Sequence, residues 1–139
     1  MKKYLTAVFL VVILATALAA ETASAQGPSL KEIFNLKQKA LHSQNLDELG
    51  KYISKDQLSE LRGAKDPKAM LFLMDYLCPQ EYELGKEEVI GSRAKVSIKG
   101  KARNTKSEGK IEPFTGEVIF IKDGSSWKIQ QETKNFQEK

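Results

Sequence analysis

Residues that commonly carry chemistry are few in this sequence of 139 residues. It contains one histidine, His42, and one cysteine, Cys78, and neither stands at a spacing typical of a metal site or a nucleophilic site. Glu87 and Glu88 are neighbours in an expected strand, where successive side chains point to opposite faces, so they do not form a catalytic pair. The sequence also lacks a glycine-rich phosphate loop and an H-E-x-x-H motif. We therefore predict no catalytic residue, no metal ligand and no cofactor.

Lys37 interrupts an otherwise apolar helix face. It lies between Ile33, Phe34 and Leu41 at helical spacing. One interpretation is that its aliphatic stem covers apolar surface while its amine reaches water. The other is that the amine lies inside a cavity and holds an acidic group of a ligand.

A row of cations follows a strand with a period of two. Because alternate residues of a strand point to opposite faces, these cations would share the face away from the helices. The row consists of Arg93, Lys95, Lys99, Lys101 and Arg103. It is either the solvated side of a sheet, neutralised in part by Glu117 and Glu132, or a contact surface. The outer face lacks the interleaved aromatic residues that stack on bases, and Ile119 and Ile121 would join it, so a protein partner or a second copy suits it better than nucleic acid.

The first 25 residues have the order of a secretory signal peptide. A short basic start precedes an apolar run from 5 to 20, and Ala23-Ser24-Ala25 forms a cleavage pattern before Gln26. The alternative is an uncleaved membrane anchor, although the run is slightly short for a span. We predict a periplasmic or secreted protein with a single domain over 26–139 and no membrane span after cleavage. An exported chain with one cysteine has no internal disulfide, and Cys78 is expected to be buried, with pairing to another chain as the alternative.

Helix signals fill the first half of this domain. Capping boxes begin at Ser29 and Ser54, Asp47 can cap a short piece through residue 52, and Asp66-Pro67 opens an apolar helix that Pro79 ends. This last helix is apolar almost all round, so we expect it to be sandwiched inside the fold or against a second copy.

Strand signals fill the second half. Runs over 82–90, 93–103, 114–121 and 127–133 are separated by Gly91-Ser92, by a polar loop over 104–113, and by Asp123-Gly124. Short turns between sequential strands predict antiparallel pairing. The fold class is therefore α+β, with N-terminal helices packed on a curved four-stranded antiparallel sheet.

The order of these elements, with HSQNLDELGKYIS, GSRAKVSI and FIKDGSSWKI, resembles the nuclear transport factor 2-like (cystatin-like) superfamily. It looks closest to small exported bacterial domains of unknown function that are related to lumazine-binding-like proteins. The resemblance implies a cone-shaped sheet around the first helix with a pocket at its open end. That pocket would be lined by Phe34, Lys37, Leu41, Phe72, Tyr76, Phe120 and Trp127.

Enzymes of this superfamily place a pair of Asp, Tyr or His residues inside the cone. Here Asp75 and Tyr76 are adjacent on a helix and so do not face one another. We interpret the chain as an exported, non-catalytic binding or accessory domain that takes a small apolar or acidic ligand, with a second copy or a protein partner expected at the outer sheet face. The alternative is a small isomerase or lyase that uses the pocket through Tyr76 or Lys37.

Overall fold

Four helices precede a four-stranded sheet in the computed structural model, which describes residues 27–137. The elements are α2 (Leu30–His42), α3 (Leu46–Leu49), α4 (Lys55–Gly63), α5 (Pro67–Leu77), β1 (Glu81–Ile90), β2 (Arg93–Asn104), the 3-10 turn η1 (Thr105–Ser107), β3 (Lys110–Asp123) and β4 (Ser126–Phe136). The expected signal peptide, its cleavage site and the alternative anchor lie outside the described residues. Within 27–137, no helix has the length and apolar character needed to cross a bilayer.

Side-chain caps fix where the helices begin. Ser29 accepts a hydrogen bond from the backbone N–H of Glu32, whose carboxylate accepts in turn from the N–H of Ser29, so the predicted capping box is confirmed. Ser54 and Asp66 cap α4 and α5 as predicted. The prediction for α3 is wrong by two residues, because Asn45 rather than Asp47 accepts from the N–H of the first turn.

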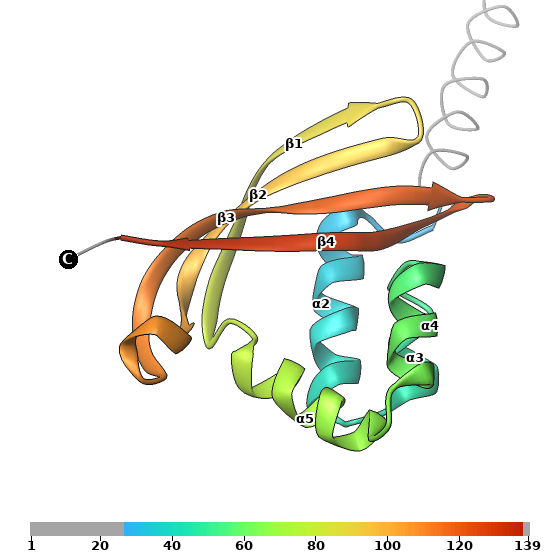
Figure 1. Cartoon of the computed structure of the whole chain (residues 1–139). Coiled ribbons are helices and arrows are strands. Elements are labelled where there is room, and N and C mark those ends of the chain that lie inside the picture. Colours follow the sequence, from blue (N-terminus) through green and yellow to red (C-terminus); the bar gives the residue numbers. More distant parts are fainter. Residues whose placement is uncertain (1–26, 138–139) are drawn as a thin grey trace, which may run out of the picture.

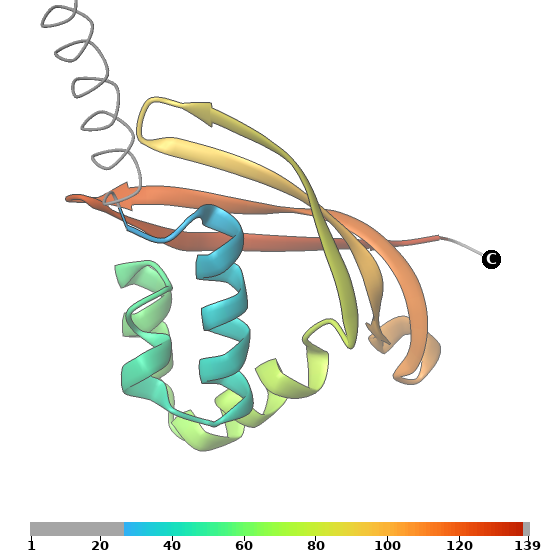
Figure 2. The same cartoon turned by 180° about the vertical axis from the view of Figure 1, so that it is seen from behind.

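The sheet is an antiparallel meander in the order β1-β2-β3-β4. Gly91 and Gly124 make the two tight turns with φ of +60° and +63°, a backbone conformation that favours glycine. The helices lie on one side of the curved sheet, and α2 approaches it with its N-terminal end (Figures 1 and 2). The α+β architecture with helices on a curved sheet is therefore confirmed.

Two boundaries in the sheet differ from the sequence prediction. β3 begins at Lys110, inside the segment expected to be a loop, and η1 closes the short connection before it. β4 continues to Phe136, three residues beyond the run over 127–133 that the sequence predicted. The β3 extension pairs with the end of β2, where Asn104 pairs with Lys110, and the β4 extension pairs with β3, where Phe136 pairs with Phe114. Backbone pairing has therefore overridden the polar composition of these segments.

Helix α2 joins the two parts of the hydrophobic core. Its first turns place Leu30, Ile33 and Phe34 against the inner face of the sheet. Its last turns place Ala40 and Leu41 against the other helices. The apolar residues that alternate with the cation row of β2, and their counterparts on β3, are all buried: Ala94, Val96, Ile98, Ala102, Phe114, Val118 and Phe120.

The curvature of the sheet brings backbones very close at two glycines. A Cβ atom built on Gly100 would lie 2.0 Å from the carbonyl oxygen of Glu81, and one on Gly116 would lie 1.8 Å from that of Thr133. Both carbonyls belong to the neighbouring strand. Only a residue without a side chain fits at these two bends.

A parallel bridge ties the helical layer to the sheet. Ile53 pairs with Ile129, and the N–H of Ser54 donates to the carbonyl of Ile129 at 2.8 Å. The N–H of Ile129 donates in turn to the carbonyl of Tyr52 at 2.8 Å. The loop between α3 and α4 is thereby held against β4 by backbone bonds.

Helix α5 is not sandwiched within the described chain, contrary to one of the two expectations for it. Of its residues only Leu71 is buried. Its large apolar side chains face solvent: Met70, Phe72, Leu73 and Tyr76.

Candidate functional site: a cleft at Trp127 and a buried polar cluster

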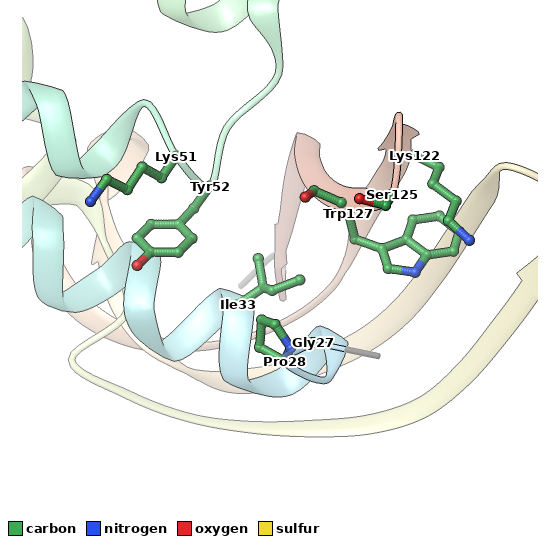
Figure 3. A pocket seen from close by; sticks show the side chains of 9 residues that line it. Gly27, Pro28, Ile33, Lys51, Tyr52, Lys122, Ser125 and Trp127 are labelled. Atoms are coloured by element: carbon green, nitrogen blue, oxygen red, sulfur yellow. The ribbon is translucent and has the colours of Figure 1, made fainter. Parts of the chain in front are cut away.

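A cleft of about 680 Å³ opens where the β3–β4 turn meets the start of α2 (Figure 3). Three parts of the chain build it, namely the segment before and inside α2, the end of the α3 segment, and the β3–β4 hairpin. The lining residues are Gly27, Pro28, Ile33, Lys51, Tyr52, Lys122, Ser125, Ser126 and Trp127. The parallel bridge at Ile53 positions this cleft, because it fixes the neighbouring Tyr52 relative to β4.

Aromatic and cationic groups meet in this cleft. The ammonium of Lys122 lies 5.4 Å from the centre of the Trp127 ring, within the range of a cation–π contact. Lys51 instead bonds Glu48, at 2.8 Å between Nζ and Oε1, and this hydrogen bond raises the pKa of Lys51. Figure 3 shows the Lys51 ammonium pointing away from Trp127. Lys122 is therefore the cation that lies beside the aromatic wall.

The structure does not bring the seven predicted pocket residues together. Phe34 and Phe120 fill the core beneath the sheet, and Leu41 belongs to the core between the helices. Phe72 is 68% exposed and Tyr76 also faces solvent. Of the seven, Trp127 alone lines the cleft described above. The sequence missed the lysine and serine residues of the hairpin because their positions in a turn carry no periodic signal.

Lys37 is buried rather than reaching water. Lys37 is only 3% exposed. Its ammonium contacts the Glu132 carboxylate at 2.5 Å and the Gln38 side-chain oxygen at 3.1 Å. It also lies 5.2 Å from the centre of the Phe34 ring. The ammonium is therefore held by groups of the protein itself.

Glu132 lies on the inner face, whereas its predicted place was the outer face. The register of β3 and β4 shifts between Ile119, which pairs with Gln131, and Phe120, which pairs with Ile129. This irregularity leaves one extra residue on β4 and reverses the direction of the side chains that follow it. A one-residue bulge has no clear sequence signature, so the pairing of Glu132 with Lys37 could not be read from alternation.

A second lysine, Lys134, lies near this pair. Its ammonium donates to the carbonyl oxygen of Leu77 at 2.9 Å, at the end of α5. Burial lowers the pKa of Lys134, and the charge of Lys37 acts in the same direction, whereas Glu132 opposes it. Lys37, Glu132 and Lys134 thus form a buried polar cluster with two cations and one anion.

The outer face of the sheet carries a ladder of ion pairs. Lys95 contacts Glu88 and Glu117, each at 3.6 Å, and the pKa of Glu88 is lowered by the nearby lysines. Two further pairs join β1 and β2: Lys99 with Glu83 at 3.6 Å, and Lys101 with Glu81 at 3.9 Å. The solvated-face interpretation of the cation row therefore fits the structure better than a free basic platform.

Arg103, Ile119 and Ile121 were also expected on the open outer face, and the structure places them differently. Arg103 stacks on Tyr76, with its guanidinium carbon 4.5 Å from the ring centre, and donates to the carbonyl of Gly109. Ile119 is buried and lines a hollow with Lys95 and Glu117, while Ile121 is half-buried. Ile119 and Ile121 are therefore less exposed than the sequence predicted, whereas Ile90 and Ile111, which pair with Arg93 and Arg103, are exposed.

His42, Asp75 and Cys78 come together where α2 and α5 end. The Nδ1 atom of His42 lies 2.5 Å from Oδ1 of Asp75, and the Cys78 thiol donates to the same oxygen at 3.8 Å. Burial raises the pKa of the Cys78 thiol, and the Asp75 charge adds to this effect. The sequence analysis treated His42 and Cys78 as unrelated, because contacts between helices leave no trace in spacing along the chain.

Comparisons with known proteins define the fold class. No protein-family model matches the chain, and no curated protein does so either. A SEC-C motif containing protein from Rhodopseudomonas palustris has a similar solved structure, with a TM-score of 0.56 and 14% identity over 76% of this chain and 77% of that one. A protein whose name carries the label NTF2 gives a TM-score of 0.52 and 12% identity, over 76% of this chain and 95% of that one.

A third similar structure is the intermembrane space region of the chloroplast protein ARC6. It gives a TM-score of 0.52 and 12% identity, over 77% of this chain and 94% of that one. Identities this low establish fold and leave activity open. The chain has a nuclear transport factor 2-like fold, so the fold that the resemblance implied is confirmed.

Proposed function

We propose that this protein is a non-catalytic binding domain whose cleft at Trp127 takes a small ligand with a flat apolar part and an anionic group. The observation that carries the proposal is the pairing of Lys122 with the Trp127 ring at the wall of the cleft. Ligand sites typically combine apolar and aromatic walls with a few polar groups that fix orientation. Tyr52 and Trp127 supply the walls here, and Lys122 with the two serine hydroxyls supplies the polar groups.

The alternative enzyme required Tyr76 or Lys37 to act in a pocket. Lys37 is engaged by Glu132 and Gln38, and Tyr76 stacks on Arg103 at the surface. Acid–base catalysis needs groups within hydrogen-bond reach of one substrate. These two residues have separate partners, so the binding function is the better supported of the two.

We propose in addition that the domain acts outside the cytoplasm, after removal of residues 1–25. This proposal rests on the basic start, the apolar run and the A-x-A pattern of the sequence. Expression in a bacterial host followed by N-terminal sequencing tests it. A mature chain that starts at Gln26 in the periplasmic fraction is expected, and a full-length chain in the membrane would contradict cleavage.

Trp127 makes the binding proposal easy to test, because it is the single tryptophan of the chain. The probe is anilinonaphthalene sulfonate, an aromatic anion of the proposed class, and the readout is energy transfer from Trp127 to the bound dye. We expect saturable binding of one dye per protein. Lys122→Glu should weaken it about tenfold, because a charge-assisted contact is lost and a repulsive one replaces it.

Two control variants separate the cleft from other surfaces. Lys110→Glu makes the same charge change at the far end of β3, and Phe72→Ser removes an exposed apolar side chain from α5. Both should bind the dye as the unmodified protein does. A dye affinity that falls with Phe72→Ser and is unchanged by Lys122→Glu would place the dye on α5 and overturn the proposal.

A further inference from the structure

Three side chains with metal-binding atoms meet at one end of the helical layer. One nitrogen of His42, one carboxylate oxygen of Asp75 and the Cys78 sulfur all lie within 4.8 Å of one another. The three residues differ in exposure, since the His42 side chain is 58% exposed, Asp75 is about half as exposed, and Cys78 is buried. A group of this kind has one wall in the core and one side open to solvent.

The local structure holds these residues in place independently of any ion. Asp75 and Cys78 are three residues apart at the end of α5, so their side chains share one side of the helix. His42 occupies the last turn of α2. Two residues after His42, the side-chain amide of Gln44 donates to the carbonyls of Leu41 and Leu71, and these bonds link the end of α2 to α5.

The distances are close to those of a tetrahedral site. With metal–ligand bonds of about 2.0–2.3 Å, tetrahedral donors lie about 3.3–3.8 Å apart. The Cys78 sulfur and Asp75 Oδ1 are 3.8 Å apart. The His42 nitrogen and the same oxygen are 2.5 Å apart, so an ion would have to replace the hydrogen bond between them and separate the pair by about 1 Å. His42 can make this movement because it is exposed.

The donor set selects among metals. A thiolate and an imidazole favour late first-row ions over Ca²⁺ and Mg²⁺, which prefer oxygen ligands. Zn²⁺ accepts sulfur, nitrogen and carboxylate oxygen together in a tetrahedral site. Three protein ligands leave the fourth position for water, which distinguishes the arrangement from a closed structural site.

We propose that His42, Asp75 and Cys78 form a surface site for a Zn²⁺ ion with one open coordination position. Binding converts the Cys78 thiol to a thiolate, and its proton passes to solvent. Lys37 and Lys134 are close enough to influence Cys78, and their positive charges favour the thiolate while they oppose the approach of a cation. The site is separate from the cleft at Trp127, so it does not depend on the ligand proposed there.

The test uses zinc alone on the purified, chelator-treated protein. Isothermal titration is expected to give one Zn²⁺ per chain, and Co²⁺ in its place should show a sulfur-to-cobalt charge-transfer band. His42→Gln and Cys78→Ser should each weaken zinc binding by about 100-fold or more, since changes even to residues behind the ligands cost 10–100-fold. Cys78→Ser should also abolish the charge-transfer band.

Matched variants keep the result interpretable. Glu60→Gln removes an exposed carboxylate from α4 and should leave zinc affinity unchanged. His42→Gln alters an exposed residue, so it tests the site even if Cys78→Ser lowers stability. The proposal is overturned if zinc does not bind, if His42→Gln binds zinc as tightly as the unmodified protein, or if the cobalt complex lacks the charge-transfer band.

Discussion

Two lysine–glutamate pairs on opposite faces of the same sheet show how environment changes the role of one interaction. Lys95 and Glu117 meet on the outer face, where both side chains are more than two-fifths exposed. Lys37 and Glu132 meet on the inner face, where the side chains are 4% and 23% exposed. Exposed pairs contribute about 0–1 kcal/mol, whereas removal of one partner from a buried pair costs about 3–5 kcal/mol. The outer pairs therefore contribute little to the free energy of unfolding, whereas loss of one partner of the inner pair should destabilise the domain strongly.

Within the inner cluster, removal of the glutamate should lower stability more than removal of a lysine, because the cluster holds two cations and one anion. Removing Glu132 leaves Lys37 and Lys134 facing each other without an anion. Removing Lys37 leaves Glu132 with Lys134 as a nearby cation. We therefore expect Glu132→Gln to lower the free energy of unfolding by about 3 kcal/mol and Lys37→Met by about 1 kcal/mol.

Urea unfolding followed by the Trp127 fluorescence measures both values. A Glu117→Gln variant on the outer face is the matched control for the removal of a glutamate. Equal losses for Glu132→Gln and Lys37→Met would show that Lys134 does not share the carboxylate. A loss for Glu117→Gln as large as that for Glu132→Gln would remove the distinction between the two faces.

A smaller effect on the inner face depends on pH. Burial lowers the pKa of Lys134 from its ordinary value of 10.5, so the unfolded chain holds this proton to higher pH than the folded protein does. The cost of burying the charge is present at neutral pH and disappears as the pH rises toward 10.5. The unmodified protein should therefore gain stability relative to Lys134→Met between pH 7 and about pH 10.

Paired urea titrations of the two proteins at both pH values, with chelator present, test this expectation. The comparison cancels the titration of other groups, which both proteins share. A difference in unfolding free energy that stays constant with pH would contradict the assignment of a lowered pKa to Lys134.

A substitution on the outer face should change the free energy of unfolding least. Lys95→Ala removes the centre of two exposed pairs, and we expect a loss below about 0.5 kcal/mol that shrinks further in about 1 M salt. Thermal unfolding at low and high salt measures it, with Lys106→Ala in the η1 turn as the control for loss of an exposed lysine. A loss that exceeds that of Lys37→Met would indicate that the outer ladder stabilises the fold.

Local signals made most of the fold predictable. The capping box at Ser29, the Asp66-Pro67 start and the turns at Gly91 and Gly124 each depend on a few neighbouring residues, and all are confirmed. The inward face of β2 followed from alternation, because β2 has no bulge in its pairing with β3.

The candidate sites were less predictable, since they depend on contacts between distant segments. The β4 bulge turned Glu132 inward and so assigned a partner to Lys37. His42 meets Asp75 through the packing of α2 on α5, and the cleft at Trp127 combines three separate segments. The resemblance to a known superfamily gave the correct fold, but it placed Phe72 and Tyr76 in a pocket where the structure has them exposed.

The two glycines at the bends of the sheet set a limit on how this sequence can vary. At Gly100 and Gly116 a single methyl group would overlap a main-chain oxygen of the adjacent strand. Even alanine would force that strand outward and flatten the concave surface on which the helices rest. Protein engineers who reshape the cleft or the helical layer can therefore vary many surface positions, while these two must stay glycine for the sheet to keep its arch.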